Sequence, residues 1–226
     1  MKYPYLLLDA DNTLFDFDAG NRHAFHEVCA RYDIPDTEES FQCYERCNNA
    51  MWAAFDRGEC TKDFLVVERF RRFLKEMGLD RDAAQCNELH LQVLGQNTLL
   101  LPHALEVCRG LSREHRLYIV TNAVAAVQRS RLAGSAIAPY ITGAFISEEA
   151  GASKPSAAYF DYVFSRIDGI TRDNCLLVGD SLSSDIRGAN SYGLPCCWYN
   201  PKGTARPEDL RIDYEIRDLR QLYDLV

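Results

Sequence analysis

Two carboxylates stand one residue apart at the end of the first apolar run of the sequence. The run "YLLLD" ends at Asp9, Asp11 follows after one alanine, and Thr13 comes two residues later. Side chains i and i+2 of an extended chain point the same way, which places these carboxylates about 6.6 Å apart or nearer. Two carboxylates held together repel each other and need a cation or a shared proton. The pair indicates acid–base or metal-assisted chemistry, against the alternative of two loop acids that only aid solubility.

Polar groups also follow three later segments. "IVTNA" supplies Thr121 and Asn122, and "GASKPS" supplies Lys154 at the expected start of a helix. "LLVGDSLSSD" supplies Asp180 and, after a turn, Asp185. Each has an ordinary alternative, as a strand-end polar pair, a solvated lysine or a helix cap. Together they predict a site for an anion and a cation, because open parallel sheets bind ligands at the carboxyl ends of their strands.

The elements that must position these groups are short apolar runs separated by helical patterns. Most runs lack alternation, which is typical of strands covered on both faces. The expected strands are residues 5–9, 117–122, 143–149, 175–181, 196–200 and 214–218. Helical spacing occurs at 102–115, 154–167 and 183–193. Strands alternating with helices predict right-handed βαβ units and an α/β core with a Rossmann-like parallel sheet.

The interval between the first two strands breaks this rhythm. It contains helical patterns only, the clearest at 61–78, where Thr61 can cap and Gly78 can end the helix. One face of that helix is expected to carry Phe64, Val67, Phe70, Phe73, Leu74 and Met77. The interval is too long for a crossover, so we expect residues 17–99 to form an inserted all-helical domain and residues 1–16 and 100–226 to form the core.

Composition narrows the class of protein. The 226 residues are 47% hydrophobic and 26% charged, with a net charge of −8. The absence of a basic stripe argues against a nucleic acid polymer or an anionic membrane as partner. No apolar run approaches the roughly 18 residues of a spanning helix, and no leader pattern opens the sequence, so a cytoplasmic protein is expected. The nine cysteines, with Cys43 and Cys47 four apart, are expected to be reduced thiols rather than a zinc site.

These motifs resemble the four motifs of the haloacid dehalogenase (HAD) superfamily of phosphatases, and the resemblance covers the whole chain. The matching sets are Asp9-x-Asp11-x-Thr13, Thr121-Asn122, Lys154-Pro155 and Gly179-Asp180-x-x-x-x-Asp185. The family has a Rossmann-like core and a small helical cap inserted after the first motif, which implies that residues 17–99 are the cap. One departure is Asn12, where many members have Gly; Asn tolerates left-handed backbone conformations better than most residues.

The resemblance implies catalytic roles for Asp9, Asp11, Thr121 and Lys154. Asp9 would be the nucleophile that forms an aspartyl phosphate, and Asp11 would be the general acid and then the general base. Both acids should then be indispensable, so Asp9→Asn and Asp11→Asn are each expected to abolish turnover.

The resemblance also implies ligands for a metal and a phosphoryl group. Mg²⁺, with Mn²⁺ as the alternative, would be held by Asp9, Asp180, Asp185 and the backbone carbonyl of Asp11. The phosphoryl oxygens would be bound by Thr121, Asn122 and Lys154. Thr13 would shape the loop.

Three segments look most like the pyrimidine 5'-nucleotidase branch of the family: "DADNTLFDFDAG", "MWAAFDRGECTKDFLVVERFRRFL" and "SKPSAAYFDYVF". That branch implies a phosphoric monoester hydrolase acting on UMP, dUMP, dTMP or noncanonical pyrimidine nucleotides, as a monomer or homodimer. Trp52 and Phe55 would stack on the base; their alternative is packing inside the cap.

Other functions remain open at this point. The first alternative is a phosphatase for a small sugar phosphate or phosphoglycolate. A 2-haloacid dehalogenase is disfavoured, because that branch carries an aromatic residue in place of Asp11. A phospho-receiver signalling domain is disfavoured, because it has no inserted helical domain.

Overall fold

The computed structural model describes residues 2–226. The chain divides into two compact units. One contains the residues up to Phe17 together with Thr98–Val226, and the other contains Asp18–Asn97.

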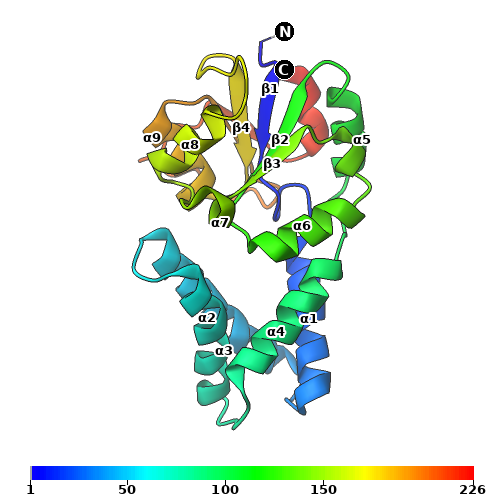
Figure 1. Cartoon of the computed structure of the whole chain (residues 1–226), viewed down its shortest axis with the longest axis vertical. Helices are drawn as coiled ribbons and strands as arrows, with labels where there is room; N and C mark the ends of the chain where they lie inside the picture. The colour runs from blue at the N-terminus through cyan, green and yellow to red at the C-terminus, as the bar shows by residue number, and fades with distance from the viewer. Residues whose placement is uncertain (1) are drawn as a thin grey trace. The chain divides into compact units, whose positions relative to one another are not determined.

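The first unit is built on one six-stranded sheet (Figure 1). Its strands are β1 (Tyr5–Leu8), β2 (Arg116–Thr121), β3 (Gly143–Ile146), β4 (Cys175–Gly179), β5 (Cys196–Tyr199) and β6 (Tyr214–Ile216). Every pairing is parallel and the order is β3-β2-β1-β4-β5-β6. The predicted Rossmann-like parallel sheet is therefore confirmed, with β1 between β2 and β4.

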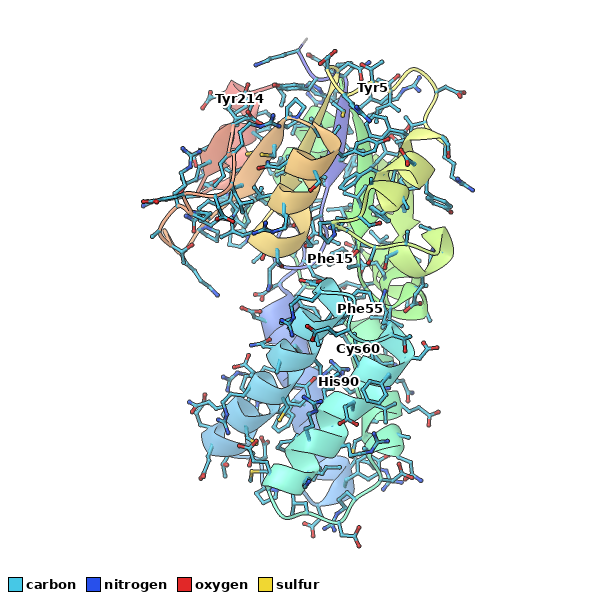
Figure 2. All side chains as sticks on the ribbon, turned by 90° about the vertical axis from the view of Figure 1, so that its left-hand side faces the viewer. Tyr5, Phe15, Phe55, Cys60, His90 and Tyr214 are labelled. Atoms are coloured by element: carbon cyan, nitrogen blue, oxygen red, sulfur yellow. The ribbon has the colours of Figure 1, made fainter. Side chains whose placement is uncertain are left out.

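Both faces of the sheet are buried, as the non-alternating strand sequences predict. Leu6 and Leu8 of β1 belong to one hydrophobic cluster, while Leu7 belongs to another. In Figure 2, Tyr5 and Tyr214 mark the amino ends of β1 and β6, and Phe15 lies beyond the carboxyl end of β1. The carboxyl ends of β1, β2 and β4 are thus neighbours along one edge.

Helices cover both faces of this sheet. They are α5 (Ala104–Leu111), α6 (Ala125–Gly134), α7 (Ser147–Ala150), α8 (Ala157–Phe164) and α9 (Arg187–Tyr192), with the short turns η1 (Ala138–Tyr140), η2 (Leu182–Ile186) and η3 (Leu219–Asp224). Gly193 ends α9 with φ of 77°. The prediction of a strand over 143–149 was too long, because the ladder to β2 ends at Ile146 and the polar residues that follow form α7.

The second unit consists of helices, with no strand within Asp18–Asn97. They are α1 (Phe17–Tyr32), α2 (Glu38–Asp56), α3 (Lys62–Glu76) and α4 (Ala83–Gln96). Their buried centre is rich in aromatic rings: Phe25, Phe41, Tyr44, Phe70 and Phe73 pack against one another.

Helix α3 begins and ends as predicted, but its buried face differs. Thr61 caps its first turn by accepting from the Phe64 backbone, and Gly78 follows with φ of 67°. Phe64 itself is 49% exposed, so its predicted place on the buried face is wrong. The buried face comprises Leu65, Val66, Arg69, Phe70, Phe73 and Leu74, with Lys62.

A buried arginine explains this rotation of the helix. The Arg69 guanidinium donates to Asn48 Oδ1 at 2.9 Å and to Asn87 Oδ1 at 3.2 Å. It also contacts His90 Nδ1 at 3.3 Å, inside the unit where Figure 2 labels His90. Burial first, and then Arg69, lowers the pKa of His90 well below its usual range, so His90 is neutral. The spacing of apolar residues does not predict that a charged residue such as Arg69 is buried.

Within residues 2–226, none of the helices is both long and apolar enough to cross a membrane.

Candidate active site

Three neighbouring strands deliver the predicted polar side chains to one edge of the sheet. Asp9 directly follows β1, Thr121 ends β2, and Asp180 directly follows β4. The backbone nitrogen of Asp9 donates to Val178 O at 2.8 Å, which ties the residue after β1 to the end of β4. The parallel register therefore brings together residues that lie more than a hundred positions apart in the sequence.

Lys154 is the centre of the site. Its ammonium group donates to Asp9 Oδ1 at 2.6 Å, to Asp185 Oδ1 at 2.6 Å and to Val120 O at 2.8 Å. The side chain is only 1% exposed. Burying an ammonium group is costly unless it is paired and fully hydrogen-bonded, and here all three of its hydrogens have acceptors.

Asn122 holds Lys154 in place. Its amide nitrogen donates to Lys154 O at 2.8 Å, and its amide oxygen accepts from Lys154 N at 2.9 Å. Both polar groups of this side chain are engaged with the Lys154 backbone. These contacts support a role in positioning Lys154 and give no support to the predicted phosphate-binding role of Asn122.

Thr121 is placed to donate a hydrogen bond. Its hydroxyl oxygen accepts from the backbone nitrogen of Ala123 at 3.3 Å, while the residue is almost completely buried. Because that contact uses a lone pair, the hydroxyl hydrogen remains for another acceptor. A phosphoryl oxygen would be such an acceptor.

The acids of the site carry unusual proton affinities. Burial, with smaller contributions from Asp185 and Asp180, raises the pKa of Asp9 well above its usual range, although Lys154 opposes the shift. Burial, and then repulsion from Asp185, raises the pKa of Asp180 to about 7. Burial alone would lower the pKa of Lys154, but Asp185 and Asp9 outweigh it and raise that pKa. The charge of Lys154 therefore does not offset the effects of burial and repulsion on Asp9 and Asp180.

The arrangement fits a hard divalent cation. One carboxylate oxygen from each of Asp9, Asp180 and Asp185 lies within 4.8 Å of the others. Carboxylate oxygens are the ligands that Mg²⁺ prefers, and a second positive charge would offset the repulsion that helps to raise the pKa values of Asp9 and Asp180.

Gly179 leaves room for this cluster. A Cβ atom there would lie 2.2 Å from Asp185 Oδ2. That oxygen also accepts from Ser181 N at 3.1 Å, while Oδ1 is bound by Lys154. Asp185 is completely buried, and hydrogen bonds hold both of its carboxylate oxygens in place.

The loop after β1 is held in a tight turn. Asn12 has φ of 57°, the left-handed conformation expected of it. Leu14 N and Phe15 N both donate to Ala10 O at 2.9 Å. Thr13 lies inside the turn, with its hydroxyl 3.4 Å from Asp9 Oδ2 and 3.4 Å from Asp180 Oδ1. These contacts support the predicted role of Thr13 in shaping the loop.

Asp11 points to a residue that sequence reasoning missed. Its Oδ1 accepts from Nη1 of Arg131, a completely buried arginine on α6. The signal in the sequence was the position of Arg131 beside Leu132, one turn after Val127, which places it on the apolar face of a helix. A charge on such a face needs a partner, and the partner is Asp11.

Comparison with known proteins decides the family. A family model described as a haloacid dehalogenase-like hydrolase matches residues 3–193. This chain belongs to that family.

Full-length relatives of this HAD hydrolase include named nucleotidases. The chain is 36% identical to the HAD-hydrolase YfnB of Bacillus subtilis, with 100% of this chain and 96% of YfnB covered. It is 32% identical to the pyrimidine 5'-nucleotidase PynA of Streptococcus pneumoniae, with 99% and 95% covered. It is 29% identical to the pyrimidine 5'-nucleotidase YjjG of Escherichia coli, with 100% and 99% covered. The resemblance to the family and to its nucleotidase branch is thereby confirmed.

A solved structure of YfnB is similar over the whole chain. It superposes with a TM-score of 0.95 and covers 100% of this chain and 99% of YfnB. The YfnB crystal structure is bound to magnesium and reveals interdomain movement in that protein.

The aromatic residues predicted to contact the substrate lie together in the helical unit of this HAD hydrolase. The rings of Trp52 and Phe55 meet edge to face, with centroids 5.8 Å apart, and the Lys62 amine lies 5.5 Å from the Phe55 centroid. Both aromatic residues are partly buried. Among the residues described, the buried aromatic cluster of this unit includes neither of them.

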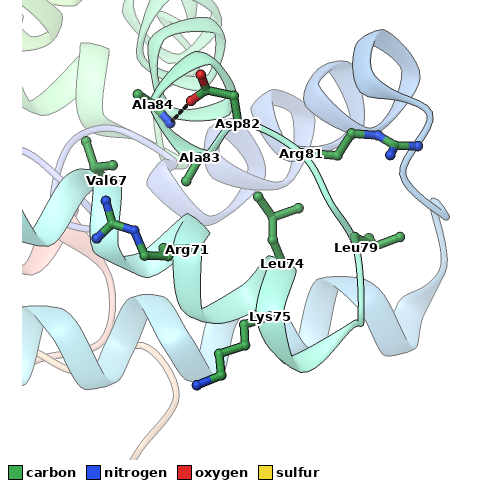
Figure 3. A pocket seen from close by; sticks show the side chains of 9 residues that line it. All are labelled: Val67, Arg71, Leu74, Lys75, Leu79, Arg81, Asp82, Ala83 and Ala84. Atoms are coloured by element: carbon green, nitrogen blue, oxygen red, sulfur yellow. Dashed lines mark hydrogen bonds between the residues drawn. The ribbon is translucent and has the colours of Figure 1, made fainter.

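Two hollows lie in the same helical unit. One of about 340 Å³ lies between α3 and the start of α4, where Arg71, Lys75 and Arg81 are among its lining residues (Figure 3). The other, of about 500 Å³, is lined in part by Cys47 and Glu76. Neither is lined by a residue predicted for the site.

Glu76 also approaches the two cysteines that the sequence singled out. Its carboxylate and the Cys43 and Cys47 sulfurs lie within 4.8 Å of one another. Glu76 is already paired with Arg46 at 2.5 Å, which supplies its counter-charge. Burial, and then Glu76, raises the pKa of Cys43 to about 11, so its thiol stays protonated near neutral pH.

Mg²⁺ binding by this HAD hydrolase is expected to weaken as the pH falls below about 7, because a proton on Asp180, whose pKa is about 7, then competes with the metal. One competing proton raises the Mg²⁺ concentration needed for half-saturation roughly ten-fold per pH unit. Titrating Mg²⁺ against the thermal midpoint of EDTA-treated protein at pH 6 and pH 8 measures this. Asp180→Asn is the matched variant and should show a weaker dependence, because Asp9, whose pKa is also raised, still takes up a proton. Equal affinity of the wild type at both pH values would contradict the expectation.

Proposed function

We propose that this chain is a Mg²⁺-dependent phosphoric monoester hydrolase that acts on pyrimidine nucleoside 5'-monophosphates through a phosphorylated Asp9. The observation that carries the proposal is the convergence of Lys154, Asp9, Asp180 and Asp185 at one sheet edge. The full-length relatives named as pyrimidine 5'-nucleotidases support the choice of substrate.

Asp9 is the proposed nucleophile. Its buried carboxylate is oriented by the Lys154 ammonium at Oδ1, and Thr13 lies near Oδ2. Attack of a carboxylate oxygen on phosphorus forms an acyl phosphate and breaks the bond to the ester oxygen. Fixing this side chain before the substrate arrives lowers the entropic part of the barrier.

Asp11 is the proposed proton carrier. The departing ester oxygen takes a proton from Asp11, and the resulting carboxylate then removes a proton from the water that hydrolyses the acyl phosphate. Its side chain is 25% exposed, more open than Asp9 or Lys154, which suits a group that must meet both substrate and water.

Thr121 is proposed to bind a phosphoryl oxygen through its hydroxyl hydrogen, and Lys154, whose three ammonium hydrogens already have acceptors, is proposed to act on the phosphoryl group through its charge. The ammonium charge and the Thr121 hydroxyl hydrogen both favour the negative charge that these oxygens carry during transfer. Mg²⁺, held by Asp9, Asp180 and Asp185 with the Asp11 carbonyl, would further neutralise that charge; Mn²⁺ is the alternative metal.

The helical unit is proposed to be the cap that selects the substrate. Trp52 and Phe55 lie outside its buried aromatic cluster and offer ring faces on which a pyrimidine can stack. A 2-haloacid dehalogenase is the weaker reading, because a halide leaving group needs neither a proton from Asp11 nor a metal.

The substrate proposal predicts a preference that a panel of esters can measure. With Mg²⁺ present, kcat/KM for UMP, dUMP and dTMP is expected to exceed that for AMP and phosphoglycolate about ten-fold or more, the range that one binding pocket supplies. Asp9→Asn protein prepared in parallel is the control for contaminating phosphatases. A preference for phosphoglycolate would replace the proposal with the alternative phosphatase, and halide release from a 2-haloacid would replace it with a dehalogenase.

The same panel tests the stacking role. Trp52→Leu is expected to raise KM for dUMP and leave KM for phosphoglycolate unchanged, because only dUMP carries a base. An equal rise for both esters would contradict base stacking.

A further inference from the structure

Arg131 is a buried charge on the apolar face of α6. It lies on α6 among Val127 and Leu132, and its side chain is 1% exposed. Burying a guanidinium costs several kcal/mol, and a buried ion pair often adds nothing to stability compared with an apolar side chain of similar volume. Stability therefore gives no reason for Arg131, and its contacts must supply one.

The guanidinium is held on three sides. Nη1 donates to Asp11 Oδ1 and also to Gln128 Oε1 at 3.2 Å. The central carbon lies 4.5 Å from the centroid of the Phe15 ring. Gln128 is one turn earlier on α6 and completely buried. The arginine is thus fixed by its own helix and by an aromatic face.

The loop that carries Asp11 also carries that aromatic face. Asn12 N donates to Phe15 O at 2.9 Å, and Phe15 is completely buried. Residues 11–15 therefore fold back so that the Asp11 carboxylate and the Phe15 ring both contact one guanidinium. A short loop with a left-handed residue at Asn12 would otherwise leave the Asp11 side chain several rotamers to choose from.

We infer that Arg131 is a positioning residue that fixes the Asp11 carboxylate through Oδ1, so that Oδ2 carries the proton exchanged with the substrate. This role rests on the proposed function, because it acts through Asp11. In the first step the P–O bond to the leaving group breaks, the bond from Asp9 to phosphorus forms, and the proton on Asp11 Oδ2 moves to the leaving oxygen. In the second step Oδ2 takes a proton from the attacking water, whose oxygen bonds to phosphorus while the bond from Asp9 to phosphorus breaks, so that phosphate leaves and the Asp9 carboxylate is restored.

A comparison of leaving groups tests the role. A nucleoside or other alkyl ester leaves as a strongly basic alkoxide and needs the proton, whereas p-nitrophenolate leaves without one. Arg131→Met is expected to lower kcat/KM for dUMP roughly 100-fold, within the range of general acid catalysis, and that for p-nitrophenyl phosphate less than about ten-fold. The fall for dUMP is expected in kcat, with KM little changed.

Three further variants sharpen the test. Arg131→Lys should recover part of the loss, because a lysine keeps the charge but lacks the rigid fork; Gln128→Leu should give a smaller loss of the same kind. Arg129→Met is the matched control: it removes an exposed arginine of the same helix that pairs with Glu149, and should leave both substrates unaffected.

A double-mutant comparison separates positioning from packing. If Arg131 acts through Asp11, then Arg131→Met in an Asp11→Asn background should not further slow the single-turnover release of p-nitrophenolate, which needs no proton from Asp11. Three results would overturn the positioning role: Arg131→Met lowers kcat/KM equally for dUMP and p-nitrophenyl phosphate, it lowers neither, or its effect adds fully to that of Asp11→Asn. None of them touches the proposed function as long as the wild type hydrolyses dUMP.

Failure of the proposed function would look different. If the wild type prefers another alkyl ester, that ester takes the place of dUMP in the comparison of leaving groups. Only the proposed substrate is then wrong. A wild type that hydrolyses no phosphate ester overturns both proposals.

Discussion

Asp9→Asn is expected to lower kcat at least about 10⁴-fold on every phosphate ester that the wild type hydrolyses, on the scale of removing an enzyme's nucleophile. An amide has no carboxylate oxygen with which to form an acyl phosphate. The substitution keeps the size of the side chain, and its amide oxygen can still accept from Lys154, so the fold should survive. Single-turnover kinetics with saturating Mg²⁺, together with the thermal midpoint, separate lost chemistry from lost structure.

Two controls make this result specific. Asp209→Asn removes an exposed carboxylate that pairs with Arg187, and should turn over at the wild-type rate. Wild-type protein quenched in acid during turnover should carry one added phosphoryl group, and the Asp9→Asn protein should carry none. A variant within about ten-fold of the wild-type rate would refute the nucleophile assignment, since that difference is only about 1.4 kcal/mol of barrier.

Most of the sheet could be predicted from sequence because buried parallel strands leave a strong local signal. "YLLLD" and "CLLVGDS" are apolar runs with no alternation, and both became central strands. Their polar ends also gave the candidate site, because the ends of neighbouring parallel strands must meet at one edge. Asp9, Thr121, Asp180 and Asp185 needed no other information to be brought together.

The features that could not be predicted from the sequence depend on tertiary contacts. The spacing places Phe64 on the apolar face of α3, but Phe64 is exposed. The buried face includes Arg69 instead, whose guanidinium donates to Asn48 and Asn87. Asn122 follows a strand like the other site residues, and its amide nitrogen and oxygen both bond to the Lys154 backbone, a contact that the strand pattern does not predict.

Arg131 was missed for the same reason. The residues near Arg131 in the sequence do not indicate its partner. Asp11 lies in the loop after β1 and contacts Arg131 only in the folded structure. Local pattern predicts which residues face inward when they are apolar. For Arg131 it indicates a place on the apolar face of a helix, but it cannot identify the distant partner, Asp11, that makes burial of the charge possible.

Lys154→Met is expected to be the most destabilising of the substitutions considered. The lysine is the cation that contacts both Asp9 and Asp185, and its loss leaves two buried carboxylates without it. Breaking a buried pair by removing one partner costs roughly 3–5 kcal/mol. For a chain of this size that corresponds to a fall in thermal midpoint of roughly 6–20 °C. Thermal melts in EDTA at pH 8 measure it, and Lys75→Met, at an exposed position on α3, is the control.

The direction of the pH effect follows from the carboxylates that remain. The pKa of Asp9 is already raised by burial, and without the opposing charge of Lys154 it must rise further. A carboxyl group whose folded-state pKa lies above its unfolded value contributes stability at low pH, and this contribution is lost as the pH rises through the folded pKa. The deficit of Lys154→Met should therefore be smaller at pH 5 than at pH 8, and added Mg²⁺ should reduce it at pH 8 by supplying a positive charge at the same acids. If the loss of stability in Lys154→Met is equal at both pH values and insensitive to Mg²⁺, then Lys154 stabilises the fold by packing alone. The carboxylates of Asp9, Asp180 and Asp185 would then not act as one charged site.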